Sequence, residues 1–348
     1  MLMEPSKDAE LYPPPLDGIS KVCFGTNSAS YFILASSWAG SISVYDSVDG
    51  TLRIEFGKAN ENPPLLDCAW IDERQVVAGN SLGQVLLYSM QSTLPTEGQL
   101  IGQHTAGVRC VAYSETIESV ITASWDSSIQ VWDIRDNLST SKSSASLTGK
   151  AFALSLHQNT CIVGTSKRKL EFWDLRKMDK AWNIQESPIR QQIRSIACSP
   201  DANRFAIGST EGRVAIQPFP SLESNGLETS SHASFSFKCH RQSAGAPDGA
   251  DLVFPVNVIC FHPVYGTFAT GGGDGVVNIW DGDSKKRICQ LRSFPCSISS
   301  LSFSSDGSQL AIASSYTFEE GERDHPPDAL YVHSVADNEV LPRHFRTE

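Results

Sequence analysis

The stretch VRCVAYSETIESVITASWDSSIQVWD, residues 108–133, decides the fold. Its first and last parts alternate apolar and polar residues with a period of two, which is typical of β-strands and excludes an amphipathic helix. A run of small residues lies between them, and a turn containing Asp126 leads to the closing Trp132–Asp133 pair. The stretch therefore predicts three consecutive strands joined by tight turns.

The same unit recurs along the chain, always as alternating strand, turn, small-residue strand, turn and alternating strand. The copies lie at 19–46, 66–89, 108–133, 152–174, 193–219 and 256–281, and a seventh begins at 298. They start about 40 to 47 residues apart, except for one gap of about 60 between the fifth and sixth copies. A period near 40–45 residues with Trp-Asp endings is the signature of four-stranded propeller blades. The sequence predicts an all-β fold, a seven-bladed WD-repeat β-propeller whose closed ring leaves only short strand edges.

We expect residues 1–348 to form this single propeller domain. The predicted blades cover roughly 16–60, 61–103, 104–149, 150–188, 189–243, 250–293 and 294–336. The last blade lacks one strand, and the N-terminal stretch from Ala9 to Tyr12 is predicted to supply it and so close the ring.

The composition favours a soluble intracellular protein. The chain has 348 residues, 40% of them hydrophobic, and a net charge of −11. No apolar run approaches the roughly 20 residues that span a bilayer, and the acidic, Pro-rich N-terminus lacks the features of a secretory signal. The nine cysteines form no CxxC pair. We therefore expect reduced structural thiols, no metal site and no cofactor.

Three residues of the third copy, His104, Ser124 and Asp126, have the side chains of a hydrolase triad. In a WD-repeat blade, however, a His before the first strand, a Ser or Thr, the turn Asp and the Trp (here Trp132) form a buried hydrogen-bond network. No nucleophile-elbow motif accompanies the three residues, and TGGGDG at 270–275 is a turn without a phosphate-loop pattern. We predict that His104, Asp126 and Trp132 are structural and that the chain is not an enzyme. A hydrolase that uses Ser124 is the alternative.

Two tryptophans, Trp38 in SSWAG and Trp125 in SWDSS, stand just before a turn at one face of the predicted ring. The corresponding position in other copies is assigned to Asn80, Lys167, Thr210, Gly273 and Tyr316. Packing of each indole on a neighbouring loop is one interpretation. Because Trp is enriched at binding hot spots, we favour the other interpretation, in which both indoles anchor a bound peptide.

Basic residues gather in the fifth copy. Arg213 in TEGRVA stands at a strand start, where other copies have Ser41, Gln84, Ser128 and Val276. Arg194 in QIRSIA adds a second cation. The stretch FSFKCHR, 235–241, holds Lys238, His240 and Arg241 and alternates like a strand, so we predict that it completes the fifth blade and brings Lys238 near Arg213. Converging Arg and Lys side chains are receptors for carboxylates or a phosphate.

This basic site lies in an insertion, 220–255, whose ends are rich in Ser, Gly and Pro and are predicted to be mobile. An acidic or phosphorylated partner suits the site better than nucleic acid, whose phosphate array requires a wide basic surface. We expect the acidic loop 318–328 and the KRK cluster at 167–169 to be solvated.

Several stretches together resemble a known family. SSWAGSISVYD, ASWDSSIQVWD, STEGRVA, FKCHR, GGGDGVVNIWD, KKRICQ and HPPDAL resemble the spindle-assembly-checkpoint WD-repeat proteins that bind Bub-type kinases, and the resemblance covers essentially the whole chain. EGRVA and FKCHR are shared with the mRNA-export WD-repeat proteins of the nuclear pore, which also have an alanine at the position of Ala39. GGGDGVVNIWD, KKRICQ and HPPDAL look more like the checkpoint members.

The resemblance implies a propeller without enzymatic activity that binds the GLEBS motif of a checkpoint kinase and of its pseudokinase relative. Trp38 and Trp125 match the family's peptide-contacting tryptophans, and Arg194 matches an arginine that pairs with acidic residues of the motif. Arg213 and Lys238 match the pair that recognises phosphothreonine in the MELT repeats of a kinetochore scaffold.

The role implied by the resemblance is recruitment of these kinases to unattached kinetochores. It implies the nucleus and, in mitosis, the kinetochore as locations, together with a cytoplasmic pool. It also implies an indirect link to the activator of the anaphase-promoting complex, and neither nucleic acid nor a membrane as a partner. The alternative is an mRNA-export adaptor that binds a GLEBS motif in a nucleoporin.

Overall fold

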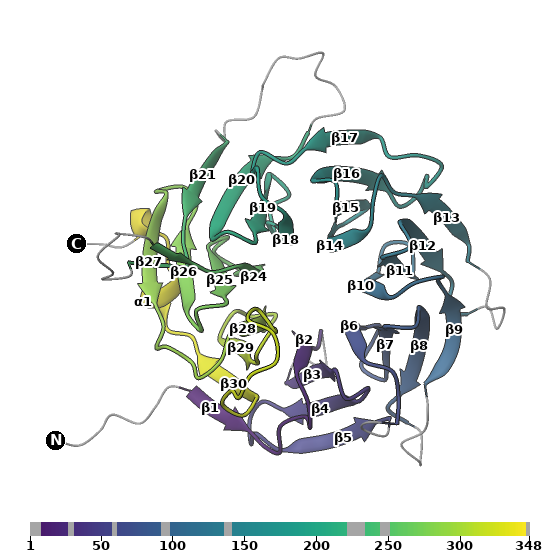
Figure 1. Ribbon diagram of the computed structural model, residues 1–348, viewed down its shortest axis with the longest axis horizontal. Helices are drawn as coiled ribbons and strands as arrows, with labels where there is room; N and C mark the ends of the chain where they lie inside the picture. The colour runs from purple at the N-terminus through teal and green to yellow at the C-terminus, as the bar shows by residue number, and fades with distance from the viewer. Residues whose placement is uncertain are drawn as a thin grey trace.

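The computed structural model describes residues 8–26, 31–57, 61–91, 98–135, 141–220, 234–243 and 251–345. These residues form a ring of antiparallel sheets around a central axis (Figure 1). The described part contains seven four-stranded sheets and one two-stranded sheet. The predicted all-β, seven-bladed propeller is confirmed.

The first four blades are each built from four consecutive strands. The strands of blade 1 are β2 (Ile19–Phe24), β3 (Phe32–Ser37), β4 (Ile42–Asp46) and β5 (Leu52–Phe56). Those of blade 2 are β6 (Leu65–Trp70), β7 (Gln75–Asn80), β8 (Gln84–Ser89) and β9 (Gln99–Gln103). Those of blade 3 are β10 (Val108–Ser114), β11 (Ser119–Ser124), β12 (Ser128–Trp132) and β13 (Ser143–Ser146). Those of blade 4 are β14 (Ala151–His157), β15 (Thr160–Thr165), β16 (Lys169–Asp174) and β17 (Asn183–Glu186).

The remaining strands form three further blades and a hairpin. The strands of blade 5 are β18 (Ile193–Cys198), β19 (Arg204–Ser209), β20 (Arg213–Pro218) and β21 (Phe235–Lys238). The hairpin consists of β22 (Arg241–Ser243) and β23 (Asp251–Val253). The strands of blade 6 are β24 (Val256–Phe261), β25 (Phe268–Gly272), β26 (Val277–Asp281) and β27 (Lys286–Gln290). Blade 7 contains β28 (Ile298–Phe303), β29 (Gln309–Ser314), β30 (Ala329–Ser334) and, from the other end of the chain, β1 (Asp8–Leu11).

The ring closes where β1 pairs with β30 in an antiparallel ladder that runs from the Asp8–His333 pair to the Leu11–Leu330 pair. The side chain of Leu11 is fully buried, and His333 Nδ1 lies 2.6 Å from a carboxylate oxygen of Asp8. A short helix, α1 (Asp337–Val340), follows blade 7 and packs beside β26 and β27.

The small residues of the second strand in each blade have a packing reason. A Cβ atom on Gly79 of β7 would lie 2.5 Å from the Val108 side chain of the next blade. A Cβ atom on Gly271 of β25 would lie 2.4 Å from Ile298 in the same way. Neighbouring blades therefore approach each other so closely that only small residues fit, as the density of protein interiors requires.

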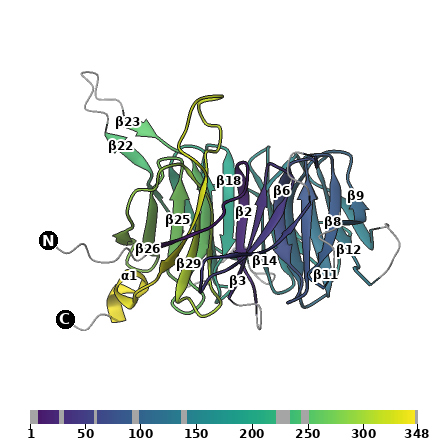
Figure 2. The same ribbon diagram turned by 90° about the horizontal axis from the view of Figure 1, so that it is seen from below.

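Two long segments project from one face of the ring. Figure 2 shows the β22–β23 hairpin and the loop between β29 and β30, residues 315–328, projecting from the same face of the disc. The predicted mobile segments of the insertion, 221–233 and 244–250, lie outside the described residues. No helix in the described part of the chain has the length and apolar character needed to cross a bilayer.

Candidate peptide-binding face

Trp38 and Trp125 occupy equivalent positions at this face. In each case the residue follows the second strand of its blade, and its backbone N–H donates to the segment before the first strand. The acceptors are the Gly18 carbonyl for Trp38, at 2.8 Å, and the Gly107 carbonyl for Trp125, at 3.0 Å. The register of the sheet therefore holds both tryptophans at the mouth of the central opening.

The same backbone hydrogen bond identifies the residue equivalent to Trp38 and Trp125 in the other blades. In three blades it is not the residue predicted from the sequence. The donors there are Ser81, Ser166 and Ser315, whereas Thr210 and Gly273 were assigned correctly. The three predicted residues, Asn80, Lys167 and Tyr316, are each one residue away from the actual donor. Alternation alone does not show at which residue a strand ends. Asn80 is in fact the buried last residue of β7, and its side chain donates to Gln84.

The two tryptophans and Arg194 line one cavity of about 620 Å³ at the mouth of the central opening. Trp38 is 48% exposed, and Trp125 is half-buried against Gly107, where a Cβ atom would lie 2.8 Å from the indole. Each indole thus packs partly on a neighbouring loop and still presents apolar surface to the cavity. The structure brings together the three residues that the sequence predicted as peptide contacts.

Arg194 stands near the start of β18, the innermost strand of blade 5, and its Nε donates to Asn257 Oδ1 at 3.1 Å. The surrounding protein strips water from the guanidinium, and this desolvation lowers the pKa of Arg194 to about 10. The positive charge of Arg109 acts in the same direction, whereas Glu319 opposes it. A cation in this state gains more from an added carboxylate than a fully solvated arginine does.

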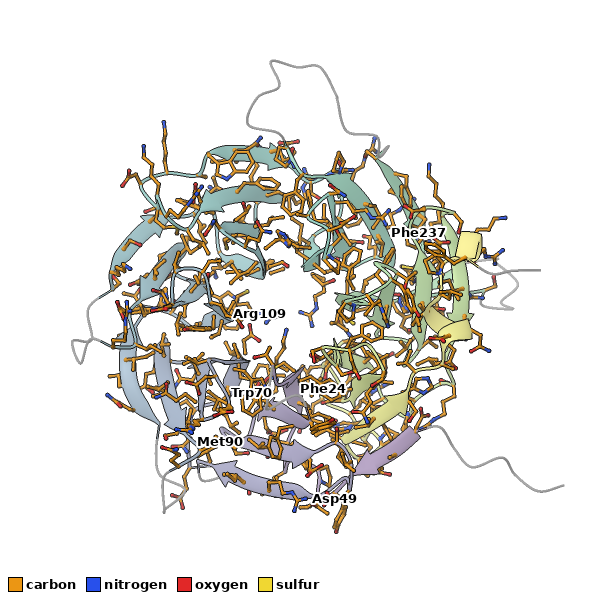
Figure 3. The ribbon with its side chains drawn as sticks, turned by 180° about the vertical axis from the view of Figure 1, so that it is seen from behind. Phe24, Asp49, Trp70, Met90, Arg109 and Phe237 are labelled. Atoms are coloured by element: carbon orange, nitrogen blue, oxygen red, sulfur yellow. The ribbon has the colours of Figure 1, made fainter. Side chains whose placement is uncertain are left out.

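Sequence reasoning missed two residues of the cavity wall. Arg109 of β10 lines the cavity and lies on the inner side of the ring (Figure 3). Its signal was a charged residue inside the apolar strand VRCVAY. Phe318, in the acidic loop that was expected only to be solvated, lines the same cavity, is 65% exposed and has a φ of 63°. A bulky residue in this left-handed conformation is strained, and such strain is concentrated at functional sites.

Arg213 and Lys238 form a second cluster on the same face, further from the ring axis. They are direct partners in the ladder between β20 and β21, Arg213 being half-buried and Lys238 exposed. Among the described residues, neither side chain has an ion-pair partner. Phe237 points the other way and packs against Trp280, with ring centroids 4.6 Å apart. The sequence predicted this outer strand and this pairing, and we call Arg213 and Lys238 the rim pair.

His240 does not belong to this surface cluster, although it is two residues from Lys238. It is buried and lies 2.8 Å from Asp274 through Nδ1 and 2.9 Å from Thr270 through Nε2, while Trp280 donates to the same threonine at 3.0 Å. Placing His240 in a surface basic patch was therefore wrong, because it is part of the packing of blade 6. Arg241 donates to the Glu211 carbonyl oxygen at 3.2 Å.

Blade 3 has the same network. Trp132 donates to Thr122 at 2.7 Å, His104 Nε2 lies 2.8 Å from that hydroxyl, and His104 Nδ1 lies 3.1 Å from Asp126. Because indole N–H can only donate, the chain of bonds runs from Trp132 through Thr122 to His104 and then to the carboxylate. Each buried polar group thereby has a partner.

The hydroxyl of this network comes from Thr122 and not from Ser124. Ser124 is turned away and donates to the carbonyl oxygens of Ala106 and Gly107, at 3.0 and 2.9 Å. A serine nucleophile must lie within hydrogen-bond reach of its histidine base, so this geometry argues against the hydrolase alternative. Of the KRK cluster only Lys167 is exposed. Arg168 donates to the backbone carbonyl oxygen of Arg190, and Lys169 pairs with Glu186.

The ring of blades and the two buried networks define a WD-repeat β-propeller. The family model described as "WD domain, G-beta repeat" matches residues 96–133 and 252–281. These two ranges contain the threonine, the aspartate and the tryptophan of both networks.

Comparison with known proteins narrows the class to one family. The chain is 40% identical over 344 residues to "Mitotic checkpoint protein BUB3.1" of Arabidopsis thaliana, covering 97% of this chain and 96% of the relative. It is 36% identical over 337 residues to "Mitotic checkpoint protein bub3" of Dictyostelium discoideum, covering 95% of this chain and 96% of the relative. It is 33% identical over 346 residues to the "Poly(A)+ RNA export protein" of Schizosaccharomyces pombe, covering 97% and 93%. The chain belongs to the BUB3 family of mitotic checkpoint WD-repeat proteins.

Proposed function

We propose that the chain is a non-enzymatic adaptor of the spindle assembly checkpoint. It binds the GLEBS motif of a checkpoint kinase, and of the kinase's pseudokinase relative, in the central cavity. It binds phosphothreonine in the MELT repeats of a kinetochore scaffold at the rim pair. By holding both ligands it recruits the kinases to unattached kinetochores and acts only indirectly on the activator of the anaphase-promoting complex.

The observation that carries the proposal is the meeting of Trp38, Trp125 and Arg194 in one cavity. Two aromatic walls bury apolar side chains of a peptide at little entropic cost, which is why Trp dominates binding hot spots. The desolvated guanidinium of Arg194 supplies the counter-charge for an acidic residue between them. Aromatic anchors beside the cations Arg194 and Arg109 suit a short acidic segment such as a GLEBS motif.

The rim pair supports the second half of the proposal. Arg213 and Lys238 place two cations side by side on adjacent strands. A phosphate group carries between one and two negative charges and three acceptor oxygens, so it can bridge both side chains. The chain has a net charge of −11, and two cations suit a single phosphate better than nucleic acid, whose phosphate array requires a wide basic surface.

The proposal places the protein in the nucleus and, during mitosis, at kinetochores, with a cytoplasmic pool. Names of the relatives in the family, such as "Mitotic checkpoint protein BUB3.1", support this placement. Neither a membrane nor nucleic acid is proposed as a partner.

Fluorescence polarisation with a labelled MELT-type peptide, with and without phosphate on its threonine, tests the proposal. The phosphorylated form binds, the unphosphorylated form does not, and Lys238→Glu removes the difference. Equal binding of both forms, or a phosphate preference that survives in Lys238→Glu, contradicts the proposal.

The export relative from S. pombe favours a second candidate function, an mRNA-export adaptor that binds a nucleoporin GLEBS motif. This candidate predicts binding to a GLEBS peptide without any preference for phosphothreonine. It also predicts localisation at the nuclear envelope, so the same peptide pair separates the two functions.

A further inference from the structure

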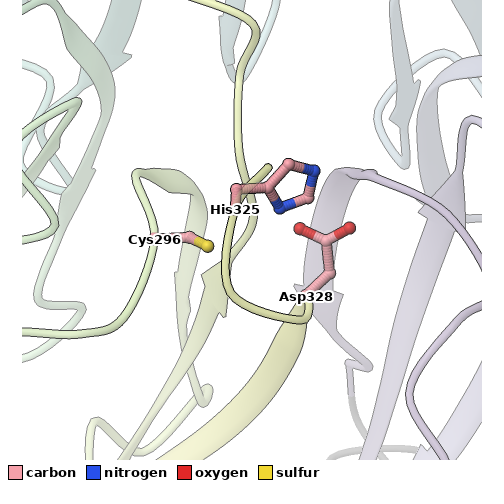
Figure 4. A group of neighbouring side chains, drawn as sticks. All are labelled: Cys296, His325 and Asp328. Carbon is pink, nitrogen blue, oxygen red and sulfur yellow. The ribbon is translucent and has the colours of Figure 1, made fainter. Parts of the chain in front are cut away.

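Three side chains with metal-binding atoms meet beside the central cavity, and the proposed function uses none of them. They are Cys296, from the connection between β27 and β28, and His325 and Asp328, from the loop 315–328. Figure 4 shows the three side chains turned toward one another. The cysteine sulfur, a histidine ring nitrogen and a carboxylate oxygen all lie within 4.8 Å of one another.

The backbone between two of these residues adds a fourth donor atom. The Pro326 carbonyl oxygen accepts from Cys296 Sγ at 3.2 Å and from His325 Nδ1 at 2.8 Å. The carboxylate of Asp328 is held in place because its Oδ1 accepts the backbone N–H of Tyr316 at 3.1 Å. A sulfur, a ring nitrogen, a carboxylate and a carbonyl oxygen therefore surround one small space.

We propose that Cys296, His325 and Asp328 bind a zinc ion, with the Pro326 carbonyl or a water molecule as the fourth ligand. Thiolate, imidazole and carboxylate are the ligands that Zn²⁺ takes in proteins, in tetrahedral geometry. On binding, the thiol releases its proton to solvent. The imidazole proton moves by exchange with solvent from Nδ1, where it is bonded to the Pro326 carbonyl oxygen, to Nε2, so that Nδ1 can coordinate. The thiolate and the carboxylate together neutralise the two charges of the ion.

The geometry requires only a small adjustment. Neighbouring ligand atoms of a tetrahedral zinc ion are roughly 3.3 to 3.7 Å apart, given Zn–N and Zn–S bonds of about 2.0–2.3 Å. The limit of 4.8 Å between the three atoms therefore leaves at most about 1.5 Å to be closed. His325 can make this movement because its side chain is exposed. It contacts the Tyr316 ring, with 5.0 Å between centroids, and the Pro326 carbonyl oxygen, which is itself a candidate ligand.

An ion at this place would connect two segments that are distant in the sequence. Cys296 is buried in the body of the ring, whereas His325 and Asp328 belong to the projecting loop and line the central cavity. Coordination would fix the end of this loop, and with it one wall of the cavity. The site could not be predicted from the sequence, because the cysteine stands far from the histidine and belongs to no CxxC pair.

Titration of the full-length protein with Co²⁺ tests the proposal, since a cobalt–thiolate bond has an absorption that weak surface binding to carboxylates lacks. We expect this absorption to saturate at one equivalent of Co²⁺ and to disappear when Zn²⁺ is added. Cys296→Ser should abolish it. His325→Ala removes a ligand and should weaken Co²⁺ binding by at least the roughly 10- to 100-fold that loss of an outer-shell partner costs.

Cys289→Ser is the matched control, because Cys289 is a partly buried cysteine of the neighbouring strand β27, and this variant should bind Co²⁺ like the wild type. Circular dichroism establishes that each variant is folded. If Cys296→Ser is unfolded, the exposed His325→Ala variant decides. The proposal is overturned if the wild type shows no thiolate absorption, or if the absorption is unchanged in Cys296→Ser or, where that variant does not fold, in His325→Ala.

Discussion

Blade 5 carries two arginines at the same ends of two strands, and their surroundings differ. Arg194, on the innermost strand β18, lies between aromatic walls, donates to Asn257 and has a pKa lowered by desolvation. Arg213, on the third strand β20, lies toward the rim and has Lys238 beside it on β21. Their distance from the ring axis, and not their position along the strand, decides the environment.

This difference suggests two modes of recognition on one face. In the centre, packing and a desolvated charge act together, so losing either costs a large part of the affinity. At the rim, two partly solvated cations act mainly through charge, so their contribution is smaller and depends on salt.

The largest expected effect comes from reversing the central charge. Arg194→Glu should weaken binding of an acidic GLEBS peptide by about 100-fold or more, because a mismatched charge in a desolvated site costs roughly 2–5 kcal/mol. Isothermal titration calorimetry measures the change. Arg190→Glu, an exposed arginine four residues earlier, is the control and should bind normally. Equal losses in both variants would mean that overall charge, and not the cavity, governs binding.

Variants of Lys238 and His240, two residues apart, should differ strongly in stability, because only His240 is buried. His240→Ala should lower the free energy of unfolding by about 2–3 kcal/mol, since it leaves Asp274 and Thr270 without their buried partner. Lys238→Ala, at an exposed position, should change it by less than about 0.5 kcal/mol. Urea unfolding of both variants gives the comparison, and similar stability losses would assign Lys238 a structural role.

Removing one cation of the rim pair should have an intermediate effect. Arg213→Ala should weaken binding of a MELT phosphopeptide about 10- to 100-fold, because hydrogen bonds to charged groups contribute roughly 1.5–3 kcal/mol. Fluorescence polarisation measures the affinity, and thermal unfolding should remain nearly unchanged. A large loss of thermal stability would show instead that Arg213 holds the blade together.

Raising the ionic strength should weaken the affinities of the two sites by different, smaller factors. Two unit charges about 4 Å apart in water interact by about 1 kcal/mol, so screening should weaken phosphopeptide binding roughly 5-fold. GLEBS binding should change less, because its central charge is shielded from ions and aromatic packing supplies much of the affinity. Parallel titrations at low and high ionic strength test this order, and the reverse order would contradict the assignment of the sites.

The smallest expected effect concerns the buried network of blade 3. Burial lowers the pKa of His104 below its ordinary value of 6.5, although Asp126 opposes this shift. As pH falls below 6.5, the unfolded chain takes up a proton that the folded protein does not. Stability should therefore decrease between roughly pH 7 and pH 5. Urea unfolding at both pH values measures this, and His104→Gln should show a smaller decrease; an equal decrease would exclude His104 as the source.

The fold could be predicted from the sequence because each blade repeats one pattern of alternation, small residues and Trp-Asp endings. The positions that depend on strand ends could not. The assignment of Asn80, Lys167 and Tyr316 was one residue off, since a period of two looks the same wherever the strand stops. Thr122 was missed as the partner of His104 for a related reason, because it faces the histidine from within the strand whereas Ser124 lies at its end.

The site was predictable only where a residue departed from its equivalents. Five residues stood out in this way: Trp38, Trp125, Arg194, Arg213 and Lys238. Phe318 did not, because it comes from a loop without an equivalent in other blades, and its approach to the cavity depends on a backbone conformation that the sequence does not reveal. His240 was misassigned because a charge run does not show which of its members is buried.

The most direct test of two independent sites is a set of four titrations. Arg194→Glu and Lys238→Glu are each titrated by fluorescence polarisation with a GLEBS peptide and with a MELT phosphopeptide. We predict that Arg194→Glu loses the GLEBS peptide and retains the phosphopeptide, and that Lys238→Glu does the reverse. Loss of both ligands in either folded variant would contradict it and indicate a single shared site.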